Sequence, residues 1–196
     1  MKETLIKLNK LFAEKKYSEL IFIIEKDIKD KSARLLNILA VTRLTRQKNK
    51  EIFIQAISEF KQGYFQEKQT KIGLECLKNF INSVIDFYDY QGRFDNSDFF
   101  ESYFNECLNF FKEAEIYFGY DSKLVSSAIR VFNRTNNIDK ALFYYDLLFK
   151  NNDLTVNKLA SWIFYNNYKK NWAQSDYLKY SNFFNSYLNI LPQDKL

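Results

Sequence analysis

Glycine and proline are so rare in this chain that few folds other than a helical one are open to it. The 196 residues contain four glycines and one proline. These two residues supply most tight hairpin turns and the loops that cradle nucleotide phosphates. Hydrophobic residues make up 46% of the sequence, enough to build a buried core. We therefore expect an all-α protein whose helices are joined by short polar turns.

Apolar residues recur at three- and four-residue spacing along almost the whole chain, as in amphipathic helices. The first such stripe contains Leu5, Leu8, Leu11 and Phe12, and polar residues from Glu14 onward end it. The further predicted helices cover about 17–30, 33–47, 51–62, 68–90, 97–117, 123–136, 139–150, 156–168 and 174–191. This gives about nine or ten helices, and no segment has the pattern of a strand.

Two halves are predicted, residues 1–90 and residues 97–196, with a polar joint at 91–96. The second half is expected to continue the helical stack of the first. Within it, Gly119 is placed to end one helix, and Asp121 is placed to cap the next helix with its side chain.

The clearest internal pattern is a set of residues at the spacing of a two-helix unit: Val125, Ala128, Ile129, Phe132, Ala141 and Tyr145. This spacing resembles the tetratricopeptide repeat, which has a period of about 34 residues, with Asp153 where the repeat has proline. A weaker match begins at Leu8, and another has its first helix around Leu39 and Ala40 and its second-helix signature at Ala56 and Phe60. The resemblance implies an α-solenoid of degenerate, antiparallel helix pairs.

Two segments near the C-terminus, Ser161–Tyr168 and Asn171–Tyr177, carry a second resemblance. They are similar to the last helices before the catalytic part of bacterial O-GlcNAc-transferase-like proteins. The chain ends at Leu196, where that resemblance would place the nucleotide-sugar-binding domains. It implies either a repeat domain acting alone or the substrate-recruiting region of a split or truncated glycosyltransferase.

In the tetratricopeptide family, five positions of the first helix of each unit line the binding groove. Carried onto the best-matched unit, these positions are Lys123, Ser126, Arg130, Asn133 and Arg134. Arg130 and Arg134 lie one turn apart, and guanidinium groups bind carboxylates through paired hydrogen bonds. The resemblance thus implies a groove for a protein or peptide, with an acidic segment favoured. The alternative is an ordinary solvated helix face.

Family members with an asparagine ladder hold peptides by their backbones, and the corresponding candidates here are Asn9, Asn37, Asn133 and Asn167.

Several kinds of chemistry are missing from the sequence. It contains no histidine, which excludes Ser-His-Asp and Cys-His catalysis and histidine metal ligation. Cys76 and Cys107 each stand alone in an apolar helical pattern and are expected to be small buried hydrophobes. Carboxylate pairs such as Glu113 with Glu115 are expected on solvated faces. We therefore expect no catalytic residue, metal or cofactor.

The net charge of +5 would suit an anionic partner, but the lysines are dispersed rather than gathered into a stripe. The many aromatic residues follow helical stripes, which favours core packing over the stacking of nucleic-acid bases. Unbroken apolar stretches are short, such as Leu20–Ile24, and a membrane span needs about 18 or more residues. A cytoplasmic, non-catalytic binding scaffold is the expected function.

Overall fold

The computed structural model of the protein describes residues 2–92, 97–135 and 137–151. Every regular element in these ranges is helical, with eight α-helices and no strand, in agreement with the predicted all-α class. No helix in the same ranges is both long and apolar enough to cross a membrane. The chain divides into two compact units, Met1–Tyr120 and Asp121–Leu196, which are described separately below. The predicted joint at 91–96 lies largely outside the described residues and stays a prediction.

The first unit contains six α-helices and two short π-helical segments. Their bounds are α1 Lys2–Ala13, α2 Tyr17–Phe22, η1 Ile23–Asp27, α3 Ala33–Arg46, α4 Lys50–Gln66, α5 Lys71–Phe87, η2 Tyr88–Gly92 and α6 Ser97–Phe118. Each α-helix matches one predicted from the sequence. Helix α4 runs four residues further than its predicted end, because Gly63 does not interrupt it.

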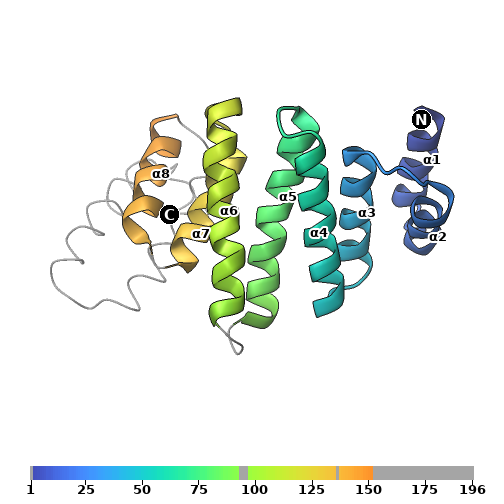
Figure 1. The fold of residues 1–196 in the computed structure, drawn as a ribbon, viewed down its shortest axis with the longest axis horizontal. Helices are drawn as coiled ribbons and strands as arrows, with labels where there is room; N and C mark the ends of the chain where they lie inside the picture. The colour runs from blue at the N-terminus through green and yellow to red at the C-terminus, as the bar shows by residue number, and fades with distance from the viewer. Residues whose placement is uncertain (1, 93–96, 136, 152–196) are drawn as a thin grey trace, which may run out of the picture. The chain divides into compact units, whose positions relative to one another are not determined.

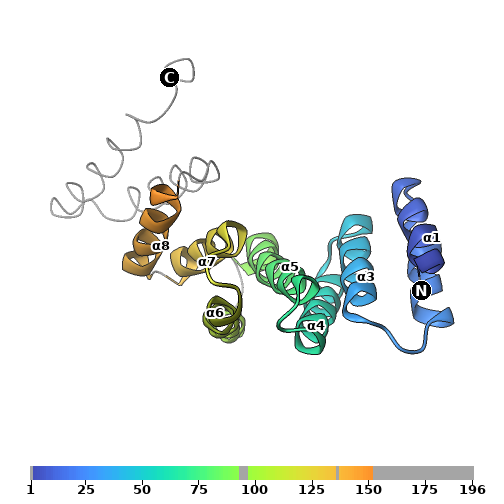
Figure 2. The same cartoon turned by 90° about the horizontal axis from the view of Figure 1, so that it is seen from above.

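Helices α3 to α6 alternate between two sides of the first unit, with α3 and α5 on one side and α4 and α6 on the other (Figures 1 and 2). Side chains link helices that are two apart in sequence. Asn79 on α5 donates to Asn37 on α3, 42 residues earlier, and Lys61 on α4 donates to Glu106 on α6, 45 residues later. The next link, from Lys68 to Glu113, also spans 45 residues, so α4 and α6 run in the same direction. These offsets are longer than the 34-residue tetratricopeptide period.

The turn between α1 and α2 is closed by backbone hydrogen bonds of the Schellman type. The amide of Lys16 donates to the carbonyl of Leu11 at 2.9 Å, and the amide of Lys15 donates to the carbonyl of Phe12 at 3.0 Å. Lys15 takes the left-handed conformation, with φ of 58°, at the position where this motif usually has glycine. The turn therefore uses a strained residue.

The second predicted helix, 17–30, is shorter and less regular than expected. It is α-helical only to Phe22, continues as η1 to Asp27, and ends where Ile28 takes an extended backbone. The isoleucines at 21, 23 and 24 lower the α-helical propensity of this stretch. Leu8, Leu11, Leu20 and Ile24 nevertheless form the buried centre of the N-terminal core.

Helices α3, α4 and α5 meet at a point where only small side chains fit. A β-carbon added at Gly63 on α4 would lie 2.8 Å from the sulfur of Cys76 on α5 and 3.3 Å from the carbonyl oxygen of Ala33 on α3. The Cys76 thiol in turn lies 3.7 Å from the same carbonyl oxygen. Gly63 thus permits a close approach of three helices.

The second unit contains α7 Ser122–Arg134 and α8 Ile138–Lys150 among its described residues. The cap predicted at Asp121 is present, because its side chain accepts a hydrogen bond of 2.8 Å from the amide of Leu124. Gly119, just before it, has φ of 61° and ends α6 as predicted. The remaining predicted helices, 156–168 and 174–191, lie outside the described residues.

Candidate functional site

The five residues predicted to line a groove all lie on the side of α7 that is not buried. The buried side chains of the helix are Leu124, Val125, Ser127, Ala128, Ile129, Val131 and Phe132. Lys123 is exposed, and Ser126, Arg130, Asn133 and Arg134 are half-buried. The helical spacing of the five residues brings them onto one face, as expected from the sequence.

The Arg134 side chain folds back along its own helix. Its Nη1 atom donates to the backbone carbonyl oxygen of Arg130 at 3.2 Å. A cation near the last turn of a helix also interacts favourably with the helix dipole. Arg130 and Arg134 therefore place two guanidinium groups near the C-terminal end of α7. The hydrogen bond from Arg134 to its own helix is one that arginines in the last turn of a helix commonly form.

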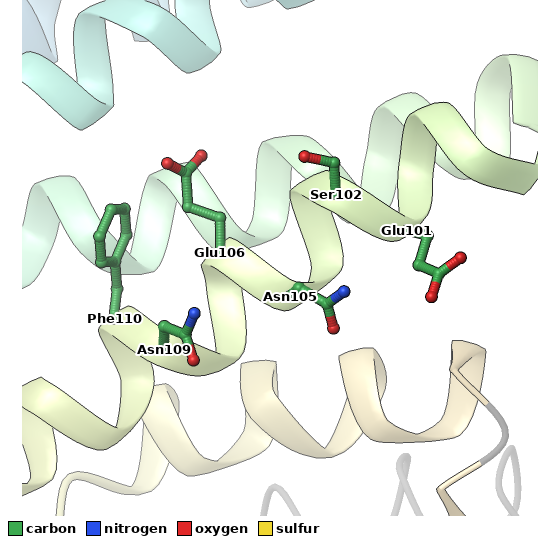
Figure 3. Close-up of a pocket in the computed structure, with 6 residues that line it drawn as sticks. All are labelled: Glu101, Ser102, Asn105, Glu106, Asn109 and Phe110. Carbon is green, nitrogen blue, oxygen red and sulfur yellow. The ribbon is translucent and has the colours of Figure 1, made fainter.

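A second polar face, not foreseen from the sequence, lies on α4 and α6. A hollow of about 520 Å³ is lined by Glu101, Ser102, Asn105, Glu106, Asn109 and Phe110, all on α6. Ser102, Glu106 and Phe110 project to one side of α6, while Asn105 and Asn109 point the other way (Figure 3). A hollow of about 550 Å³ on α4 is lined by Ser58, Lys61, Gln62, Phe65 and Gln66.

Side chains that line the two hollows contact each other directly between α4 and α6. Lys61 forms an ion pair with Glu106, and its ammonium group lies 6.0 Å from the centre of the Phe110 ring. Phe65 and Phe110 pack edge to face, with ring centres 5.3 Å apart. These side chains hold the helices together, so they are already engaged within the protein.

Glu113 is not the solvated carboxylate that the sequence predicts. It is half-buried, accepts a bond of 2.7 Å from Lys68 Nζ, and accepts a second bond of 3.2 Å from the hydroxyl of Tyr64. Burial raises the pKa of the Tyr64 hydroxyl, and the neighbouring Glu113 carboxylate raises it further. The sequence could not indicate this because Lys68 and Glu113 are far apart along the chain.

A cluster of charged side chains, largely buried except at Glu25, joins the N-terminal helices to α3 and α4. Arg43 on α3 donates from Nε to both carboxylate oxygens of Glu59 on α4, at 3.0 and 3.2 Å. Its Nη2 atom donates to Glu25 on η1. The exposed fraction of the side chain is 8% for Arg43, 12% for Glu59 and 37% for Glu25. Burial raises the pKa of Glu59 to about 7, although Arg43 acts in the opposite direction.

The expected behaviour of the cysteines is confirmed. Both side chains are fully buried and neither forms a disulfide. Burial raises the pKa of the Cys76 thiol to about 12 and that of the Cys107 thiol well above its usual value. Over the described ranges no group of His, Cys, Asp or Glu side chains is arranged to hold a metal ion.

Two neighbouring tyrosines of α8 differ in exposure. Tyr145 is only 2% exposed, while Tyr144 is half-buried. Tyr145 follows Ala141 and Leu142 on the buried side of α8, so it belongs to the core. Of the asparagine-ladder candidates, Asn37 accepts a bond of 2.8 Å from Asn79, which ties it to α5.

The segments resembling O-GlcNAc-transferase-like proteins, Ser161–Tyr168 and Asn171–Tyr177, lie outside the described residues. Comparisons of the chain with protein-family models, with curated proteins and with solved structures found no match.

Proposed function

We propose that the protein is a non-catalytic scaffold that binds an acidic protein or peptide segment on the polar face of α7 described above. The observation that carries this proposal is the composition of that face. Lys123, Arg130 and Arg134 are cationic, Ser126 and Asn133 can donate hydrogen bonds, and none of these five residues is acidic. Such a surface favours carboxylate ligands over cationic or apolar ligands.

The α7 helix is a suitable support for such a surface because its opposite side is fixed. Seven of its residues are buried, and Asp121 caps its first turn. A side chain on a well-packed helix loses less conformational entropy on binding than one on a loop, which leaves more of the interaction energy for the ligand. A carboxylate that bridges Arg130 and Arg134 would use the two-donor geometry of the guanidinium group.

The repeat-like arrangement of the first unit supports a scaffolding role. The parallel course of α3 with α5 and of α4 with α6 is what stacked helix pairs produce, and an α-solenoid built in this way offers extended binding surfaces. We extend this interpretation to the whole chain as part of the proposal, with a cytoplasmic location.

The proposal is tested by titrating the full chain into fluorescein-labelled peptides of equal length, one rich in glutamate and one with glutamine at the same positions. We expect the wild type to prefer the glutamate peptide. An Arg130→Ala, Arg134→Ala variant should bind it about tenfold or more weakly. The matched control removes two exposed cations of α1, through Lys7→Ala and Lys10→Ala.

Equal affinity of the wild type and the α7 variant for the glutamate peptide would overturn this assignment. Equal losses in both double variants would mean that net charge, and not the α7 face, attracts the peptide. A single-stranded oligonucleotide serves as a third probe. Binding to it that falls steeply with salt, together with no preference for the glutamate peptide, would favour a nucleic-acid partner instead.

A further inference from the structure

The Arg43 cluster joins charged side chains from three separate helical segments of the first unit, and two of the three, Arg43 and Glu59, are largely buried. Arg43 lies on α3, Glu59 on α4, and Glu25 on the π-helical segment η1 that follows α2. The contact between Arg43 and Glu25 therefore ties the N-terminal helices α1, α2 and η1 to the α3–α4 hairpin. Glu25 is the more exposed of the two carboxylates, so this end of the cluster is open to water.

The cluster has more negative than positive charge at its centre. One guanidinium group faces two carboxylates when both are ionised. The Lys31 ammonium, in the segment between η1 and α3, also acts favourably on the ionised Glu59, while Glu25 opposes its ionisation. Helix α5 packs on α4 as well, but among the described residues it adds no charge that acts on the Glu59 carboxyl.

We propose that the Arg43 cluster is a pH-sensitive latch, which fastens the N-terminal helices α1, α2 and η1 onto α3 and α4 more tightly when Glu59 takes up a proton. With Glu59 neutral, Arg43 and Glu25 form a balanced pair of one cation and one anion. With Glu59 ionised, the second carboxylate competes for the same guanidinium and repels Glu25. The exchange involves one proton from solvent and no other reactant.

The direction of the effect follows from linkage. Undocking η1 moves the Glu25 charge away from the Glu59 carboxyl, and because that charge raises the pKa of Glu59, its loss lowers the pKa. The docked state thus binds the proton more strongly than the undocked state. Docking is then favoured as the pH falls through about 7, the pKa of Glu59 in the folded protein, and weakened as the pH rises through it.

The composition of the chain allows a pH effect near neutrality to be attributed to Glu59. The sequence has no histidine, and both thiols have pKa values far above the neutral range. Ordinary aspartate, glutamate and lysine side chains do not titrate between about pH 5.5 and about pH 8.5. The α-amino group does titrate there, so the experiment uses a protein whose N-terminus is acetylated.

The test is amide hydrogen exchange of the full chain across this pH range, read by mass spectrometry and converted to protection factors. In the wild type, we expect the protection factors of residues 2–27, relative to those of α5, to rise about three- to tenfold as the pH is lowered from about 8.5 to about 5.5. The size follows from linkage, because a difference of one pKa unit between the docked and undocked states changes the docking equilibrium constant tenfold. Glu59→Gln, which keeps an acceptor for Arg43 but cannot ionise, should give a flat profile. Glu51→Gln, at an exposed position on the same helix, should retain the wild-type slope.

A flat wild-type profile would overturn the proposal, and so would an equal slope in Glu59→Gln. If Glu59→Gln does not fold, Glu25→Gln replaces it. This variant removes the charge that repels ionised Glu59, so the proposal requires a reduced slope, and an unchanged slope would reject it.

Discussion

The sulfur atom of Cys76 occupies the space that a β-carbon at Gly63 would need, since the two would lie 2.8 Å apart. The Gly63→Ala substitution is therefore expected to destabilise the protein, although alanine is the better helix former by about 1 kcal/mol. Overpacking costs typically about 1–3 kcal/mol, and the backbone of Ala33 blocks an easy adjustment. We expect a net loss of about 1–2 kcal/mol in the free energy of unfolding, measured with urea.

A second substitution distinguishes steric overlap from other effects at position 63. Replacing Cys76 by alanine removes the sulfur and opens the space. In the Gly63→Ala, Cys76→Ala double variant the two losses should be less than additive. Full additivity would show that contact with the sulfur is not the cause.

Lys15 offers a site where the protein can be made more stable. Its φ of 58° is costly for a residue with a side chain and is readily adopted by glycine. The Lys15→Gly variant should raise the free energy of unfolding by about 0.5–1 kcal/mol. Ala13→Gly, two residues earlier and within α1, is the contrasting control and should lower it by a similar amount. If both glycines lower stability, the strain at Lys15 is negligible.

Arg43 should be among the least replaceable charged residues of the first unit. The Arg43→Met substitution leaves Glu59 buried at a side-chain exposure of 12% without its cation. Removing one partner of a buried pair costs typically about 3–5 kcal/mol, and because Glu59 can take up a proton once Arg43 is gone, the loss at neutral pH should lie at or below the lower end of this range. Adding Glu59→Leu to Arg43→Met should recover part of this loss, because the uncompensated carboxyl is then gone. Thermal or urea unfolding of the single and double variants measures the difference in their free energies of unfolding. If the double variant is no more stable than Arg43→Met, the unpaired Glu59 carboxyl is not the cause of the loss.

The two thiols are expected to resist modification in the folded protein. Cys76 and Cys107 are fully buried, and the thiolate is the reactive form. A pKa of about 12 for Cys76 means that only about one thiol in ten thousand is ionised at pH 8. An aromatic disulfide reagent should label neither thiol in native buffer and both in denaturant. A Ser58→Cys variant supplies an exposed thiol as the positive control, and rapid labelling of the wild type would contradict the burial.

The sequence predicted the elements well because local periodicity decides them. All eight α-helices in the described ranges follow apolar stripes, and the polar face of α7 follows from the same periodicity. The sequence missed features that depend on contacts across the fold. Nothing near Arg43 along the chain indicates Glu59 or Glu25, and nothing near Glu113 indicates Lys68. The π-helical segment η1 was also missed, since its stripe of isoleucines looks the same as that of an α-helix.

The bonds that join α6 to the α4 side of the stack couple the stability of α4, α5 and α6. In many stacked helical arrays each pair contacts only its neighbours, and pairs can then unravel one at a time from an end. Here two ion pairs reach past the neighbouring helix α5. Glu106 on α6 pairs with Lys61 on α4, and Glu113 on α6 pairs with Lys68 in the turn that follows α4. Separating α5 from α4 would therefore also disturb the contacts that α6 makes with both, so a perturbation introduced at α5 should be felt at α6.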